Sequence, residues 1–288
     1  MIVIELSGGL GNQMFQYALY KKFESLNKDV VMETSFFRSG QELRELELGI
    51  FPVKYKEITD KEAASIRGYG YQDSVLDKIR YKLTPKKYKV YIDKIGPFQP
   101  EIFEMENVYL SGYWQNENYF KDIREIVCRD FSFSDELVEC NKELCHTLEN
   151  ENSVSVHIRR GDYLTTENTR IHGNICTDAY YANAMNYIRE SVENPQFYIF
   201  TDDLEWVREK YRGQNVMIVE GNRNDSSYVD MFLMSKCKHN IVANSTFSWW
   251  GAWLNSNPDK LVLAPPKWLN NFEEAQVACA EWILIDNQ

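Results

Sequence analysis

The sequence has no long apolar run. No segment holds about 18 consecutive apolar residues, so we expect no membrane-spanning helix. The first residues, Met1–Leu6, include no basic side chain and are followed at once by polar residues, which argues against a signal peptide. They favour a first β-strand, and we expect a cytoplasmic protein.

The sequence also lacks any Cys-x-x-Cys pair. Isolated cysteines are typical of free thiols in a reducing compartment. Cys140, Cys145 and His146 lie close together on a predicted helix, but nothing suggests further ligands, so a zinc site is not expected. The cysteines are Cys128, Cys140, Cys145, Cys176, Cys237 and Cys279.

Positive charge is outnumbered, with 32 Lys and Arg residues against 43 Asp and Glu residues. The 288 residues carry a net charge of -11, which argues against a nucleic-acid partner because such a partner usually needs a basic face. Any phosphate site must therefore be basic locally. The segment 80–89 is basic, and it is interpreted either as a solvated loop or as a peripheral contact with an anionic inner-membrane surface. Hydrophobic residues make up 44% of the chain, enough for a sizeable core.

The N-terminal strand is followed by a glycine-rich loop, Ser7–Gln13, and then by an apolar helical pattern. Strand, glycine loop and helix can present backbone N–H groups to an anion. The loop lacks the Gly-Lys-Ser/Thr of a P-loop, and Met14 stands where a dinucleotide fingerprint needs its third glycine. Glu33 follows a second strand about where a ribose-binding acid would lie, so NAD binding stays open. Asn12 and Gln13 suit either recognition of a sugar or phosphate, or helix capping.

An aromatic and polar tip ends the predicted strand near residue 110. Tyr113, Trp114 and Gln115 suit stacking and hydrogen bonding to a sugar, although such aromatic residues are also frequent in cores.

The second half of the chain alternates strands with helices. Predicted strands cover 153–158, 196–200, 216–219, 240–243 and 261–264, separated by helical patterns, which indicates βαβ units and a parallel sheet. We predict an α/β protein with two Rossmann-like domains facing across a cleft, at 1–150 and 151–288, joined by the polar segment 149–152.

Polar side chains follow three strands of this second domain. His157, Arg159, Arg160 and Asp162 end the first, Asp202 and Asp203 the second, and residues 244–250 the third. In a parallel sheet these ends share one edge, where ligands bind. Arginines fork onto phosphate oxygens, a carboxylate can accept two N–H bonds from a guanine edge, and a helix N-terminus favours phosphate. Together they predict a nucleotide-diphosphate site. Taken singly, the arginine could pair with Asp162 as a strut, and the aspartates, serines and threonine could cap helices.

A metal is not needed in this interpretation. The chain contains no Asp-x-Asp, and arginine with helix N-termini can carry the charge of a leaving diphosphate.

Three segments closely resemble the bacterial α-1,2-fucosyltransferases of glycosyltransferase family 11. They are Ser7–Ala18, Val156–Tyr163 and Asn244–Ala252, and the resemblance covers essentially the whole chain. It is more distant to the α-1,6- and protein O-fucosyltransferases. The resemblance implies a GT-B fold, GDP-fucose as donor, no metal or other cofactor, inversion at the fucose anomeric carbon, and transfer to the 2-hydroxyl of a terminal galactose in an oligosaccharide or lipid-linked glycan.

The resemblance also implies roles for individual residues. Arg159 matches the arginine that contacts the β-phosphate and assists its departure. His157 and Asp202 match positions near the guanosine, and Arg160 is expected to be held by Asp162. Residues expected beside the diphosphate are Asn12, Thr246, Phe247 and Ser248.

The general base is not fixed by the sequence. Glu167, at the spacing of the proposed base in the α-1,6 relatives, and Asp162 are the candidates, with His172 third. The remaining alternative is that no carboxylate base acts, with an oxocarbenium-like transition state. The acceptor glycan is also open, with Tyr113, Trp114 and Gln115 expected to help choose it.

Two other functions remain possible. One is an NAD-dependent oxidoreductase. The other is a non-catalytic glycan- or nucleotide-binding protein, with Trp114, Trp249 and Trp250 as stacking platforms.

Overall fold

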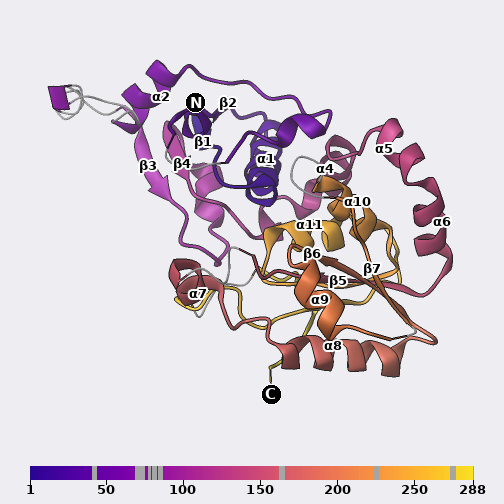
Figure 1. The fold of residues 1–288 in the computed structure, drawn as a ribbon. Helices are drawn as coiled ribbons and strands as arrows, with labels where there is room; N and C mark the ends of the chain where they lie inside the picture. Colours follow the sequence, from indigo (N-terminus) through magenta and orange to yellow (C-terminus); the bar gives the residue numbers. More distant parts are fainter. Residues whose placement is uncertain are drawn as a thin grey trace. The chain divides into compact units, whose positions relative to one another are not determined.

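A computed structural model shows two compact α/β units, Met1–Ser132 and Phe133–Gln288 (Figure 1). It describes residues 1–40, 44–68, 75, 76, 79, 83, 87–161, 166–213, 215–222, 227–272 and 277–287, without the side chains of 166–168. Most of the basic segment 80–89 lies outside the described residues. In the described ranges, no helix combines the length and apolar character needed to cross a membrane.

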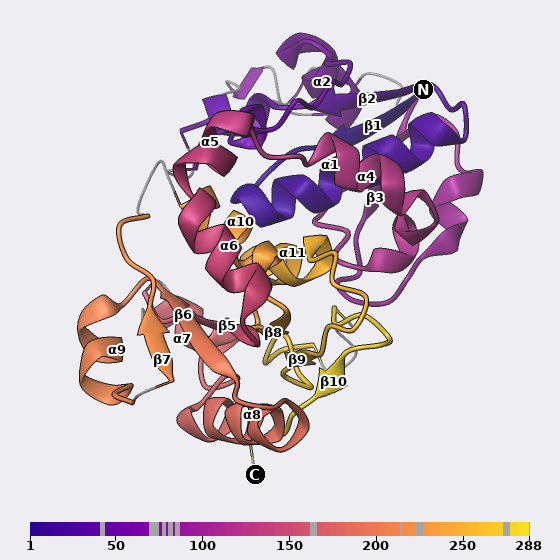
Figure 2. The ribbon, with the colours of Figure 1, turned by 90° about the vertical axis from the view of Figure 1, so that its right-hand side faces the viewer.

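The first unit is built on a four-stranded parallel sheet in the order β2-β1-β4-β3. One face is covered by the core of Val3, Val31, Tyr109 and residues near α2, while α1 lies on the other face (Figure 2). The strands are β1 (Ile2–Glu5), β2 (Val30–Glu33), β3 (Lys89–Ile92) and β4 (Val108–Ser111). The α-helices are α1 (Leu10–Ser25), α2 (Asp60–Arg67) and α4 (Arg124–Asp130), with 3-10 turns η1 (Ser35–Arg38), η2 (Leu48–Ile50), η3 (Pro100–Glu104), η4 (Glu117–Tyr119) and η5 (Lys121–Ile123).

Helix α1 begins without a side-chain cap. Its N-cap is Gly9, and the Asn12 backbone N–H donates to the Gly9 carbonyl at 2.9 Å. The interpretation of Asn12 and Gln13 as capping side chains is therefore wrong, since both lie inside the helix, and their amides make other contacts.

The second unit is built on a six-stranded parallel sheet in the order β10-β9-β8-β5-β6-β7. Its strands are β5 (Ser153–Ile158), β6 (Gln196–Thr201), β7 (Val216–Ile218), β8 (His239–Ile241), β9 (Val262–Ala264) and β10 (Ile283–Leu284). Its helices are α5 (Asp135–Cys140), α6 (Lys142–Asn150), α7 (Thr166–His172), α8 (Asp178–Ser191), α9 (Leu204–Lys210), α10 (Tyr228–Lys236) and α11 (Thr246–Leu254). The parallel sheet and five of its strands are as predicted, while the two-residue β10 was not predicted.

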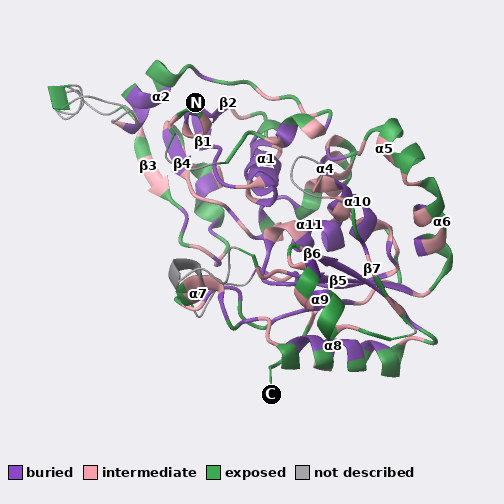
Figure 3. Cartoon of the chain, in the orientation of Figure 1, coloured by how far each residue is buried: buried purple, intermediate pink, exposed green. Residues whose placement is uncertain are grey.

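Apolar residues of β5 and β6 contribute to two hydrophobic cores, which lie on opposite faces of the sheet. Val156 and Ile199 pack toward α8 and α9, whereas Tyr198 and Phe200 pack toward α6 and α10. In Figures 1 and 2, α8 lies on one side of the sheet and α6, α10 and α11 lie on the other. Figure 3 shows β5 buried along its length, as a strand covered on both faces must be.

The division between the units falls 18 residues before the predicted one. Cys145 and Leu148 of α6 are buried against Phe232 and Leu233 of α10, so the helices before residue 150 belong to the second unit. The polar segment 149–152 connects α6 to β5 within the second unit. Its composition is the same as that expected of a linker between domains, so the sequence could not distinguish the two.

Candidate functional site

The three chemistry-bearing strand ends of the second unit are neighbours. β5 lies between β8 and β6, with Val156 opposite Ile241 and Ile158 opposite Thr201. All three strands are parallel, so their carboxyl ends share one edge of the sheet. The prediction of a shared edge is confirmed.

Two arginines and two aspartates form parallel ion pairs at this edge. The Arg159 Nη1 lies 2.9 Å from Asp202 Oδ2, and the Arg160 Nε lies 3.0 Å from Asp203 Oδ2. The register explains the pairing, because the residues after Ile158 stand opposite those after Thr201. The Arg160 backbone N–H also donates to Asp202 Oδ1 at 2.9 Å. The carboxylate that holds Arg160 is thus Asp203, whereas the predicted partner, Asp162, lies outside the described residues.

The paired side chains remain reachable by a ligand. Each of the four is 25–29% exposed, so an anion could meet both guanidiniums without unfolding the edge. The Arg160 guanidinium also lies 3.8 Å from the centre of the Trp206 ring, which fixes its plane. Asp203 caps α9 by accepting the Trp206 N–H at 3.2 Å, so the capping interpretation holds for Asp203.

His157 sits under this edge as a neutral imidazole. It is 5% exposed, and burial, reinforced by the nearby positive charge of Arg159, lowers the pKa of His157 to about 4. Its Nδ1 has no hydrogen-bond partner within the described ranges, and its ring centre lies 5.8 Å from that of Phe247. A buried polar atom left unpaired is costly, so His157 is suited to receive a ligand hydrogen bond.

The third strand end leads into α11. The helix begins at Thr246, and Thr246 and Phe247 are half-buried. Ser248 is 1% exposed, and its Oγ accepts the Ala243 N–H at 3.2 Å and lies 3.2 Å from the Ser245 carbonyl oxygen. The Ser248 hydroxyl is therefore used inside the turn, and the placement of Ser248 beside the diphosphate stays a prediction.

The tryptophans are core residues. Trp114, Trp249 and Trp250 are each 0% exposed, and Trp249 stacks on Trp253 with ring centres 6.0 Å apart. A fully buried ring cannot stack on a sugar. The stacking platforms of the binding-protein alternative and the acceptor contact predicted at Trp114 are both wrong here.

A second group of predicted residues meets at the strand ends of the first unit. Gln115 Nε2 donates to Asn12 Oδ1 at 2.8 Å. Gly8 has φ +75, and a Cβ there would lie 2.8 Å from Asn12 Nδ2 and 3.1 Å from the Tyr113 ring. Asn12, Tyr113 and Gln115 are partly exposed. The glycine loop and the aromatic tip therefore form one surface whose exposed amide and phenol groups come from Asn12, Tyr113 and Gln115.

Two buried glutamines of α1 organise this surface, and the sequence interpretation missed both roles. Gln16 Nε2 donates to the Gly112 carbonyl at 2.8 Å, while its Oε1 accepts the Ser7 N–H at 3.0 Å. Gln13 Nε2 donates to the Gly8 carbonyl at 2.9 Å. Gln13 and Gln16 lie three residues apart on an otherwise apolar helix face, and this spacing could have indicated that both side chains make buried hydrogen bonds.

Glu33 is already committed to structural contacts. It is 1% exposed, and it lies 3.0 Å from Arg67 Nη1 and accepts the Tyr109 hydroxyl at 2.7 Å. A ribose-binding carboxylate must be free, so the structure removes the feature that kept NAD binding open.

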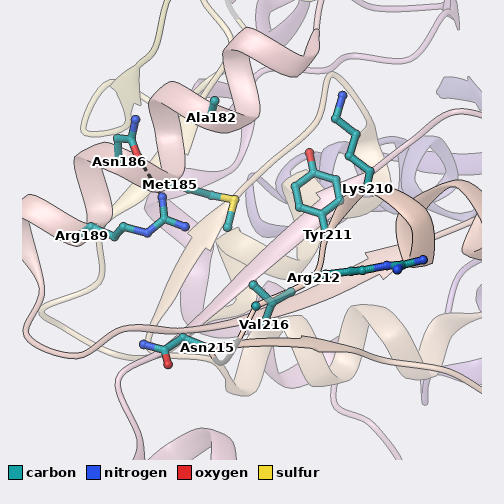
Figure 4. Close-up of a pocket in the computed structure, with 10 residues that line it drawn as sticks. Ala182, Met185, Asn186, Arg189, Lys210, Tyr211, Arg212, Asn215 and Val216 are labelled. Atoms are coloured by element: carbon teal, nitrogen blue, oxygen red, sulfur yellow. Dashed lines mark hydrogen bonds between the residues drawn. The ribbon is translucent and has the colours of Figure 1, made fainter.

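A cavity of the second unit lies elsewhere. It measures about 570 Å³ and is lined by α8 and by the segment from the end of α9 to the start of β7 (Figure 4). Because that is the amino end of β7, the cavity lies away from the edge that carries Arg159. Arg189, Lys210 and Arg212 line it, as exposed side chains.

The two leading base candidates belong to the segment that follows β5. Asp162 and the Glu167 side chain lie outside the described residues, although α7 contains the backbone of Glu167. His172 ends the same helix.

The family model described as Glycosyl transferase family 11 matches residues 82–286. The chain is 35% identical to the O-antigen biosynthesis glycosyltransferase WbnK of Escherichia coli, over 96% of this chain and 98% of the relative. It is 34% identical to an alpha-1,2-colitosyltransferase of Escherichia coli, over 99% of both chains. It is 29% identical to galactoside alpha-(1,2)-fucosyltransferase 1 of Saimiri boliviensis boliviensis, over 62% of this chain and 52% of the relative.

The fold is shared with a solved structure of a point mutant of Arabidopsis thaliana FUT1 in complex with GDP. The TM-score is 0.51 at 8% identity, over 91% of this chain and 70% of that one. This similarity, with two parallel α/β units, confirms the predicted class of two Rossmann-like domains of GT-B type.

Proposed function

The chain belongs to glycosyl transferase family 11, and on that premise we propose that it transfers L-fucose from GDP-fucose to the 2-hydroxyl of a terminal galactose, with inversion at C1. Family membership makes it a glycosyltransferase. The observation that carries the finer proposal is the pair of Arg–Asp contacts at the ends of β5 and β6, since a departing diphosphate needs cationic groups there.

In this proposal Arg159 neutralises the leaving β-phosphate. Its guanidinium has five donors, so it can keep one contact with Asp202 while it forks onto a phosphate oxygen pair. Asp202 aims the arginine before the donor arrives, because it accepts both the side chain and the next backbone N–H. One well-placed donor is worth about 3 kcal/mol of transition-state stabilisation.

The neutral groups around Arg159 suit the rest of the donor. His157 carries no charge at pH 7, so it can hydrogen-bond a guanosine or phosphate oxygen without a permanent ion pair. The N-terminus of α11, at Thr246 and Phe247, offers backbone N–H groups to the diphosphate.

The first unit supplies the acceptor side of the proposal. Asn12, Tyr113 and Gln115 present amide and phenol groups, which suit the hydroxyls of a galactoside, and Asn12 is also the residue assigned to the diphosphate by family resemblance. The relative WbnK acts in O-antigen biosynthesis, which favours a lipid-linked glycan as acceptor. The general base stays a prediction, with Asp162, Glu167 or neither as the alternatives.

A related donor is the second candidate. The relative that matches 99% of this chain is named for colitose, the 3-deoxy form of fucose. The primate relative is named for fucose and galactoside, but it covers only 62% of this chain. An enzyme that discriminates between fucose and colitose must recognise the presence or absence of the 3-hydroxyl.

The test is GDP release from GDP-fucose and, in parallel, from GDP-colitose, with lactose, type 1 and type 3 disaccharides and a lipid-linked repeat as acceptors. We expect galactoside-dependent release from GDP-fucose and a product with an α-1,2 linkage. Release only from GDP-colitose would contradict the fucose assignment, and release that ignores the acceptor would contradict transfer to galactose.

We also propose that the reaction needs no metal. Arg159 and the start of α11 supply positive charge where a divalent cation would otherwise be required. Transfer should therefore persist within about twofold in excess EDTA, and a loss restored by Mg²⁺ would contradict this point.

A peripheral contact with an anionic inner membrane is the last part of the proposal. Val75, Leu76, Ile79 and Leu83 are helical and at least half exposed; the first three precede the basic segment 80–89, and Leu83 lies within it. Sedimentation with anionic but not with neutral vesicles is the expected result, and equal sedimentation with both would contradict it.

A further inference from the structure

The segment after β3 contains a buried carboxylate, Asp93, that no step of the proposed reaction uses. Asp93 is 8% exposed, and its backbone N–H donates to the Ser111 carbonyl at 2.8 Å, at the end of β4. Burial raises the pKa of the Asp93 carboxyl, although several hydrogen bonds favour its charged form. A buried carboxylate is costly unless it has partners, so its partners indicate what it is for.

The partners of Asp93 come from two loops. Its Oδ2 accepts the Trp114 backbone N–H at 2.9 Å. Its Oδ1 accepts the Ile95 backbone N–H and Gln99 Nε2, each at 3.2 Å. One carboxylate therefore ties the loop after β3 to the loop after β4.

The loop after β4 has an unusual backbone that depends on this contact. Gly112 has φ +133, and a Cβ there would lie only 2.3 Å from the Asp93 Cβ. Trp114 has φ +58, a strained value for a bulky residue, and its side chain is fully buried. The hydrogen bond from the Trp114 N–H to Asp93 holds this strained turn.

The turn decides where the exposed residues on either side of Trp114 lie. Tyr113 and Gln115 are partly exposed, and Gln115 donates to Asn12 at 2.8 Å. Gln16 supports the turn from below through the Gly112 carbonyl. With Trp114 anchored in the core, Tyr113 and Gln115 are presented next to the glycine loop.

We propose that Asp93 is a positioning residue for acceptor binding, which acts by holding the turn that presents Tyr113 and Gln115. The inference rests on the proposed function, because it assigns this surface to the galactose-terminated acceptor. Asp93 itself touches no substrate. Its charge matters because every contact of the carboxylate comes from an N–H donor, and an amide in its place turns one acceptor into a donor.

The test is a comparison of kinetic constants for Asp93→Asn with those of the wild-type enzyme. We expect the acceptor KM to rise by at least about tenfold, while the donor KM and the slow acceptor-independent hydrolysis of GDP-fucose stay within about twofold. The matched control is Glu104→Gln, an exposed carboxylate of η3 in the same unit that no described hydrogen bond joins to the turn. The control should leave all three constants unchanged.

A general structural role predicts a different result. If Asp93→Asn changes the donor and acceptor constants equally, or changes neither, the positioning role is wrong. If Asp93→Asn does not fold, Gln99→Met removes one donor to the same carboxylate and must raise the acceptor KM by at least about threefold. Wild-type protein that fails to hydrolyse or transfer from GDP-fucose contradicts the proposed function itself, which separates the two failures.

Discussion

The two units both place loops at the carboxyl edges of parallel sheets, but the groups they expose there differ. At the edge of the second unit, two guanidiniums and two carboxylates are paired and partly exposed. At the edge of the first unit, the amides of Gln115, Asn12 and Gln16 are joined by neutral hydrogen bonds, and the strained Trp114 backbone donates to the Asp93 carboxylate. The carboxylate that holds this turn, Asp93 of the segment after β3, is buried beneath the surface rather than placed on it.

This difference matches the two halves of the proposed reaction. A leaving diphosphate gains charge as the glycosidic bond breaks, and preorganised cations stabilise that charge. An acceptor sugar is neutral, and its selection depends on hydrogen bonds whose loss leaves buried groups unpaired. We therefore expect changes in the second unit to act on rate and donor binding, and changes in the first to act on stability and acceptor binding.

The largest effect is expected at the ion pairs. Asp202→Ala removes the carboxylate that aims Arg159, and a displacement of about 1 Å can cost about 100-fold in rate. Asp203→Ala is the matched control, because it removes a carboxylate from Arg160 and the cap of α9 but leaves Arg159 paired. It should cost about 1 kcal/mol of stability and less than tenfold in rate. Steady-state kinetics on both variants checks this, and equal losses would contradict a special role for Arg159.

The next effect lies in the first unit. Gly112→Ala places a Cβ in a positive-φ turn and against Asp93, so it should lower the free energy of unfolding by about 3 kcal/mol. Gly49→Ala is the control, since no atom lies within 4 Å of the position of its added Cβ. Urea denaturation measures both, and similar stabilities would show that the turn is not held as described.

A smaller effect concerns pH. Burial raises the pKa of Asp230 to about 6, above the value near 3.9 of an unfolded chain. The folded state therefore binds the proton more tightly, and the contribution of Asp230 to stability falls as pH rises from about 4 to about 6. Asp230→Asn should be more stable than wild type by about 2 kcal/mol at pH 7 but not at pH 4. Thermal unfolding at both pH values measures this difference, and a difference that does not change with pH would contradict it.

The smallest effect is expected at Ser248. Because its hydroxyl bonds within the turn, Ser248→Ala should cost about 1 kcal/mol of stability and leave the donor KM within about twofold. Thr246→Ala, at the half-buried start of α11, should raise the donor KM more. Donor titrations of both variants decide between them, and a larger change at Ser248 would place it in the donor site.

Sequence predicted the second unit well because its strands are apolar runs that end in distinct polar residues. Once the sheet is parallel, β5 and β6 must end at the same edge, so Arg159 and Asp202 had to be close. Their direct pairing depends on register, which the sequence does not specify. For Arg160 the sequence favoured Asp162, two residues away, over Asp203 on the next strand.

The first unit was less predictable because its organising contacts join distant segments. The hydrogen bonds of Gln16 connect Ser7 with Gly112, and nothing in the local pattern marks such a link. The sequence also did not show which aromatic side chains are exposed to solvent. Trp114, Trp249 and Trp250 follow strands as surface aromatics do, yet helix and loop packing bury all three.

The central claim is that Arg159 stabilises the leaving diphosphate, and the turnover of Arg159→Ala tests it most directly. The comparison includes Arg159→Lys, which keeps the charge but loses the fork, and Arg129→Ala, a 71% exposed arginine of the first unit. We expect a folded Arg159→Ala protein whose kcat falls by at least about 100-fold, with an intermediate loss for the lysine variant and none for Arg129→Ala. A folded Arg159→Ala enzyme that turns over GDP-fucose within about threefold of wild type would contradict this role of Arg159.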